Sequence, residues 1–199
     1  MRLPRAERER QALDAARELF AARGYAAVTM DEVAAAIGVT KPLLYTYFGN
    51  KEQLFLECMT PAGDALVETV ARAVAPTGSP AAALRAGVHA FFAFVDDDRR
   101  SWRVLFDATL PANGVLAARA AAQRERLTGL IAANQLARLP AERREAARAE
   151  IDGLSAAMLA AAEALARWWL RTEAMPAADA AELLVRTVEP GLRAQARQT

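Results

Sequence analysis

The chain has 199 residues, of which 54% are hydrophobic and 25% charged, a size and composition typical of one large or two small globular domains. Its formal net charge of +1 excludes binding of nucleic acid through overall basicity, so any DNA contact must come from locally placed charges. Cys58 is the only cysteine, which excludes an internal disulfide and a cysteine metal cluster within one chain. No apolar run reaches the length of a membrane span, and we expect a cytoplasmic protein without a membrane partner.

The first predicted element is a helix at residues 9–23, where apolar residues follow a helical period until Gly24 ends it. Ahead of this helix, Arg2, Arg5 and Arg8 lie in a short polar arm that we expect to be mobile. Such an arm either lies on phosphates or is a frayed terminus, and its composition fits both alternatives equally.

Residues 29–38 predict a short second helix. Thr29 and Glu32 have the spacing of a capping box, in which each side chain bonds the other residue's backbone amide. Gly38 supplies the left-handed conformation that ends a helix. A third helix begins directly afterwards, so the stretch reads as a helix-turn-helix.

Thr40 is the predicted cap of this third helix, with Pro42 in its first turn, where a missing amide hydrogen is harmless. Leu44 and Phe48 are four residues apart and should pack inward. The exposed face then carries Lys41, Leu43, Tyr45 and Tyr47.

These patterns, together with the run from Ala12 to Phe20 and the Gly24-Tyr25 step, closely resemble the DNA-binding domain of TetR-family transcriptional regulators. The resemblance covers residues 8–55. It rests above all on Leu44-Tyr45-Thr46-Tyr47-Phe48 before Lys51.

The chain after residue 50 predicts helices only. Residues 51–74 form a fourth helix, in which Pro61 is expected to cause a kink or a local break. Further helices are expected at residues 80–95, 101–109, 115–139, 142–172 and 179–195. We therefore predict an all-α fold of about nine helices, with a three-helix DNA-binding domain at residues 1–50 and a larger effector-binding and dimerisation domain at 51–199.

The resemblance also implies roles for single residues. It places Lys41, Pro42, Leu43 and Tyr45 in the major groove, with Thr40 at the start of the same helix. Lys41 is then the residue expected to read guanine, and Thr29, Tyr47 and Lys51 are expected to contact phosphates.

The larger domain contains many aromatic residues, which either fill its core or enclose a ligand cavity. Because TetR-family proteins typically bind a small effector there, we predict an apolar or aromatic ligand in contact with His89, Phe92, Trp102, Phe106 and Trp168. His89 is the only histidine, and no catalytic set or metal site is found. We predict no cofactor and no enzymatic activity.

Two hypotheses follow. The first is an effector-responsive homodimer, a repressor by resemblance, that binds a pseudo-palindromic operator in double-stranded DNA. The second is a helical ligand-binding or scaffolding protein of the same fold without DNA binding. The only two lysines, Lys41 and Lys51, both fall in the helix-turn-helix stretch, and this favours the first hypothesis.

Overall fold

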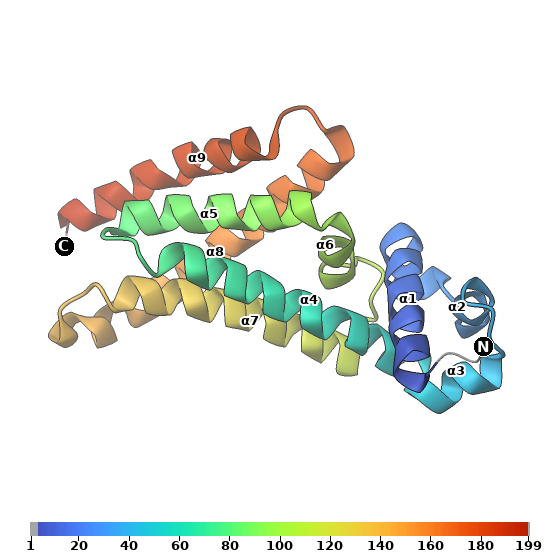
Figure 1. Ribbon diagram of the computed structural model, residues 1–199. Helices are drawn as coiled ribbons and strands as arrows, with labels where there is room; N and C mark the ends of the chain where they lie inside the picture. Colours follow the sequence, from blue (N-terminus) through green and yellow to red (C-terminus); the bar gives the residue numbers. More distant parts are fainter. Residues whose placement is uncertain (1–3, 199) are drawn as a thin grey trace. The chain divides into compact units, whose positions relative to one another are not determined.

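The computed structural model describes residues 4–198 and the side chains of residues 4–191 (Figure 1). Every regular element in this part of the chain is a helix, which confirms the predicted all-α fold. The helices are α1 (Arg5–Ala27), α2 (Met30–Ala36), α3 (Lys41–Phe48), α4 (Lys51–Val74), α5 (Pro80–Asp97), α6 (Arg99–Leu105), α7 (Val115–Leu136), α8 (Ala141–Thr172) and α9 (Ala177–Gln198).

Contacts between residues divide the chain into two compact units. The first unit comprises the residues up to Asp64 together with Asp98–Ala122. The second comprises Ala65–Asp97 and the residues from Gln123 onward. The first unit thus adds α6 and the beginnings of α4 and α7 to the three N-terminal helices, while the functional boundary at residue 50 stays a prediction.

The start of α1 differs from the sequence prediction. The helix begins at Arg5, and the Arg5 Nε lies 2.7 Å from the Glu9 carboxylate one turn later. The expected mobile arm is therefore wrong for Arg5 and Arg8, because acidic residues spaced three or four positions along a helix support its first turns. Arg2 lies outside the described residues.

Three aromatic rings, those of Phe20, Tyr25 and Phe55, pack together in the first unit. The Phe20 ring lies 4.9 Å from the Phe55 ring, and the Tyr25 ring lies 5.2 Å from Phe55, both pairs in edge-to-face geometry. Leu44 and Phe48 of α3 are buried as predicted, with 0% and 3% of their surface exposed. The inward face of α3 is therefore fixed by packing against the unit's core.

The helix α4 runs unbroken through Pro61, so the predicted local break is wrong. Pro61 lies on the exposed side of the helix, where water can replace the backbone bond that proline removes. Next to it, Arg119 of α7 donates a hydrogen bond to the Thr60 hydroxyl at 3.2 Å.

The helix α6 is shifted from its predicted position. Asp98 caps it by accepting from the Ser101 amide at 3.0 Å and the Ser101 hydroxyl at 2.6 Å, so the helix begins at Arg99 instead of residue 101. It ends at Leu105. The residues Asp107 to Thr109, expected to be helical, lie in the connection to α7.

In the second unit, α5 packs along α9 and also contacts α8 (Figure 1). The Phe92 ring lies 6.3 Å from the Trp169 ring across this contact. Glu163 is buried on α8, where Arg124 of α7 pairs with it at 3.0 Å. A buried carboxylate requires such a partner, and this pair ties α7 to α8.

Candidate functional site

The capping box that opens α2 is present in full, as predicted. The Glu32 amide donates to the Thr29 hydroxyl at 3.3 Å, and the Thr29 amide donates to the Glu32 carboxylate at 2.8 Å. Arg23 also donates to Glu32, at 2.6 Å. The bonds from Arg23 and Thr29 lower the pKa of Glu32 to about 2. The Thr29 hydroxyl itself donates to Glu32 at 2.9 Å, so this donor would have to turn away from Glu32 to reach a phosphate.

The exposed face of α3 begins directly after its cap. Thr40 is the N-cap residue, although its side chain makes no capping bond, and Gly38 before it has a positive φ of 66°. Lys41, Pro42 and Tyr45 are exposed, and Leu43 and Tyr47 are half-buried. The helix thus presents one cation, two hydroxyl-bearing rings and two apolar side chains, the side-chain types that contact base edges and thymine methyls.

Lys41 is paired across the turn with α2. Its ammonium donates to the Asp31 carboxylate at 3.0 Å, and this bond raises the pKa of Lys41. Both side chains are more than half exposed. Exposed ion pairs contribute only about 0–1 kcal/mol, so a DNA acceptor can replace Asp31 as the partner of Lys41.

A hollow lies beside α3, between the start of α1 and the turn of the helix-turn-helix. It is lined by Arg5, Arg8, Gly38, Val39, Thr40, Leu43 and Tyr47. The Arg5 guanidinium lies 5.4 Å from the centre of the Tyr47 ring. Two arginines at the rim of a hollow next to an exposed helix can hold a phosphate group.

Lys51, predicted to contact phosphate, binds the chain's own backbone. Its ammonium donates to the carbonyl oxygens of Tyr25 at 2.9 Å and Val28 at 3.0 Å, and it lies 4.2 Å from the centre of the Tyr25 ring. These bonds fix the connection between α1 and α2. An ammonium has three N–H donors, so a phosphate contact is compatible with this arrangement.

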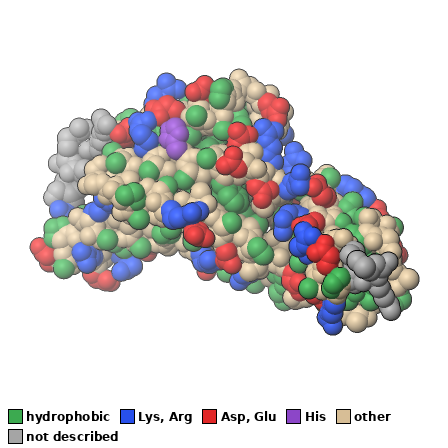
Figure 2. All heavy atoms as spheres, in the orientation of Figure 1, with side chains coloured by type: hydrophobic (Ala, Val, Ile, Leu, Met, Phe, Trp, Pro, Cys, Tyr) green, Lys and Arg blue, Asp and Glu red, His purple; other side chains and the backbone are tan. Residues whose placement is uncertain are grey.

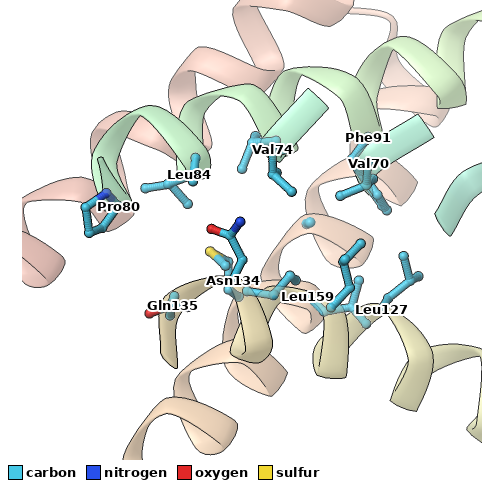
Figure 3. A pocket seen from close by; sticks show the side chains of 16 residues that line it. Val70, Val74, Pro80, Leu84, Phe91, Leu127, Asn134, Gln135 and Leu159 are labelled. Carbon is cyan, nitrogen blue, oxygen red and sulfur yellow. The ribbon is translucent and has the colours of Figure 1, made fainter. Parts of the chain in front are cut away.

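A cavity lies within the second unit, between α5, α7, α8 and the end of α4 (Figure 3). Its volume is about 70 Å³, and its walls are formed by Val70, Val74, Pro80, Ala83, Leu84, Gly87, Val88, Phe91, Leu127, Leu130, Ile131, Asn134, Gln135, Met158, Leu159 and Ala162. No ionisable side chain is among these residues. The amide of Asn134 points from α7 into the cavity toward Leu84 (Figure 3).

Comparison with known proteins identifies the family. The family model described as bacterial regulatory proteins, tetR family, matches residues 12–58, and the model described as Tetracyclin repressor-like, C-terminal domain, matches residues 80–189. The fold is similar to that of a TetR-like transcriptional regulator from Rhodococcus sp. RHA1, with a TM-score of 0.77 and 33% identity over 96% of this chain and 99% of that one. The chain belongs to the TetR family of transcriptional regulators. A TetR-family regulator from Streptomyces coelicolor gives a TM-score of 0.75 at 25% identity, over 99% of this chain and 85% of that one.

The TetR-family assignment makes this protein a DNA-binding transcription regulator and not an enzyme. The chain is also 44% identical over 106 residues to the HTH-type transcriptional activator FasR of Mycolicibacterium smegmatis. That match covers 53% of this chain and 48% of FasR, so the chain spans about half the length of this curated relative.

The five residues predicted to contact an effector do not line the cavity. Trp102 and Phe106 belong to the first unit, where their rings lie 4.0 Å apart. Phe92 is buried against Phe91 and Trp169, and Trp168 is half-buried on α8. Their role as effector contacts stays a prediction.

His89 lies on the surface between α5 and α9. It is seen in purple among charged side chains in Figure 2, and its Nε2 lies 3.5 Å from the Glu182 carboxylate, which also pairs with Arg85. Burial of Glu182 opposes its ionisation, but the bonds from Arg85 and His89 outweigh burial and lower the pKa of Glu182.

The residues that do line the cavity carried only a weak signal in the sequence. Leu127, Leu130, Ile131 and Asn134 recur at the spacing of one helical face, which identifies an inward stripe on α7. The same spacing describes a filled core equally well. Only the packing of α5 and α8 against that stripe distinguishes the two.

Proposed function

We propose that the exposed face of α3 reads base edges in a major groove, with Lys41 as the residue that selects guanine and Pro42, Leu43 and Tyr45 beside it. The observation that carries this proposal is the division of α3 into a buried side, Leu44 and Phe48, and an exposed side that begins at Lys41. The exchangeable pair with Asp31 supports it, because Asp31 holds the ammonium at the surface without burying it.

Phosphate contacts surround this face in the proposed complex. Arg5, Arg8 and Tyr47 line the hollow beside α3, and Thr29 and Lys51 lie at the starts of α2 and α4. Such contacts fix the position of the protein on DNA without reading sequence.

The test of base reading is selection of duplexes from a random pool by the parent protein, followed by affinity measurements with Lys41→Ala. Removing a base contact should weaken binding to the selected duplex by about 1–3 kcal/mol while changing random-duplex binding little. The matched control is Arg8→Ala, which should weaken both duplexes alike. Equal weakening of both by Lys41→Ala would refute the assignment.

We further propose that the protein binds as a homodimer to a pseudo-palindromic operator and represses transcription, as the family resemblance implies. The 44% identity to FasR, which is named an activator, makes activation the alternative. Transcription in vitro from a promoter carrying the selected site decides the sign: less transcript with added protein supports repression, and more transcript supports activation.

The cavity between α5, α7 and α8 is the proposed effector site. Its uncharged walls favour an apolar ligand with a neutral hydrogen-bonding group near Asn134 and Gln135. Its volume of about 70 Å³ is below the roughly 150 Å³ of a protein cavity that binds benzene. The walls must therefore move apart when a ligand enters, and this movement gives a physical route from ligand to conformational change.

Two neighbouring alanines of α5 allow a matched test of this site. Ala83 lines the cavity and Ala82 is exposed next to it. Ala83→Leu should reduce binding of decanol, measured by displacement of the dye anilinonaphthalenesulfonate, whereas Ala82→Leu should leave it unchanged. Equal binding by both variants would place the ligand elsewhere.

A further inference from the structure

Residues 24–29, which comprise the last turn of α1 after its interruption at Gly24 and the step to α2, are called here the α1–α2 connection. It contains two backbone amides that helix geometry leaves without partners. Gly24 has φ 77° and ψ 162°, which interrupts α1 and makes the following residues the start of a new helical turn. The first amides of a helical turn have no intrahelical acceptor. Tyr25 and Ala26 carry these amides, and they need acceptors from outside the segment.

The connection between α6 and α7 supplies both acceptors. The Asp107 carboxylate accepts from the Tyr25 amide at 2.6 Å, and the Thr109 hydroxyl accepts from the Ala26 amide at 3.1 Å. The other Asp107 oxygen accepts from the Thr109 amide at 2.7 Å, which holds the two acceptors in one arrangement. Asp107 and Thr109 therefore act as an N-cap for the Tyr25 and Ala26 amides, although they lie 82 and 83 residues away along the chain.

The approach of the two segments is close enough to require glycine. A Cβ atom on residue 24 would lie 2.6 Å from the Thr109 hydroxyl oxygen and 3.3 Å from an Asp107 carboxylate oxygen. The carbonyl groups of the connection are also bonded. Lys51 binds those of Tyr25 and Val28, and Arg23 donates to that of Ala27 at 2.9 Å.

We propose that Asp107 and Thr109 are positioning residues for DNA binding. By capping Tyr25 and Ala26 they hold the connection that leads directly into the Thr29 cap of α2, and so they set the orientation in which α2 and α3 meet DNA. This proposal rests on the DNA-binding function of the family.

The test compares hydroxyl removal at two threonines. Thr109→Val removes the acceptor for Ala26, and Thr109→Ser restores it. Thr128→Val is the matched control, because the Thr128 hydroxyl bonds the carbonyl of Arg124 within α7 at 3.1 Å. Amide hydrogen exchange at Ala26, thermal unfolding, and affinity for a duplex selected by the parent from a random pool and for an unselected duplex are measured for each.

Loss of one hydrogen bond changes an equilibrium about twofold to tenfold. Thr109→Val should speed exchange at Ala26 by that factor and weaken binding to the selected duplex several-fold, with random-duplex binding unchanged. Thr109→Ser should recover both values, and Thr128→Val should change neither.

Faster exchange in Thr109→Val with an unchanged ratio of selected to random affinity would overturn the proposal, leaving a purely structural cap. The same holds if Thr109→Ser fails to recover that ratio. Failure of the parent to select any duplex would instead overturn DNA binding itself, and the positioning role with it.

Discussion

The capping bonds inside the helix-turn-helix and the ion pair that joins two helices of the second unit span very different distances along the chain. In the helix-turn-helix, Thr29 and Glu32 cap α2 from three residues apart. In the second unit, the Arg85 and Glu182 pair that joins α5 to α9 is separated by 97 residues. Short-range bonds form wherever the local sequence provides them, whereas long-range contacts depend on the whole packing arrangement. The caps of the helix-turn-helix are therefore fixed by nearby residues, whereas the walls of the cavity in the second unit depend on helices that are far apart in the sequence.

The largest expected effect tests how tightly the first unit is packed. Phe55→Ala removes a fully buried ring that meets both Phe20 and Tyr25 edge to face. It should lower the free energy of unfolding by about 3–5 kcal/mol. Urea denaturation measures this change. Ala83→Leu adds volume next to the cavity and should lower the free energy of unfolding far less. An equal loss in the two variants would show that the cavity region is packed as tightly as the core around Phe55.

Gly24→Ala tests the contact between the α1–α2 connection and Thr109. The positive φ and the contact of a new Cβ at 2.6 Å should together cost about 1–3 kcal/mol of unfolding free energy. The control is Gly129→Ala on α7, where no atom lies within 4 Å of the added Cβ and alanine should stabilise the helix by about 0.5–1 kcal/mol. Thermal denaturation of the two variants should therefore shift in opposite directions, and shifts of the same sign would contradict the close approach.

Substitution of the two N-cap threonines compares a cap whose side chain makes a hydrogen bond with one whose side chain does not. The Thr29 side chain accepts a capping bond, and the Thr40 side chain does not. Thr29→Ala should cost about 1 kcal/mol of unfolding free energy, and Thr40→Ala should cost clearly less. Equal costs in urea denaturation would show that the capping box contributes little.

The smallest expected effect is a dependence of the free energy of unfolding on pH that comes from Glu32. The pKa of Glu32, about 2 in the folded protein, lies below its ordinary value of 4.5 because Arg23 and Thr29 bond the carboxylate. The folded state therefore binds this proton more weakly, so the contribution of Glu32 is complete above about pH 4.5 and is lost as pH falls toward 2. Glu32→Gln should be less stable than the parent at pH 7 and converge with it near pH 2. A constant difference across this range would contradict the shifted pKa.

Features that depend on residues close together in the sequence could be predicted. The caps at Thr29 and the buried pair Leu44 and Phe48 follow from spacings of three and four residues, and the structure confirms them. The backbone bonds of Lys51 could not be predicted, because their acceptors lie 23 and 26 residues away. Asp107 was placed in a helix, since nothing near it shows that the Tyr25 amide needs its carboxylate.

The cavity marks a second limit of sequence reasoning. The sequence analysis predicted aromatic residues around an effector, and the walls of this cavity consist mainly of aliphatic side chains of α5, α7 and α8. Hydrophobic periodicity identifies which side of a helix faces inward. It does not show where facing side chains fail to fill the space between them.

We propose that two copies of this chain place two α3 helices on one DNA duplex. Hydroxyl-radical footprinting on a duplex selected by the parent protein tests it most directly. We expect two protected segments whose centres lie about one helical turn, roughly 34 Å, apart, and we expect Lys41→Ala to weaken the protection of each. A single protected segment, or two segments unaffected by Lys41→Ala, would contradict it.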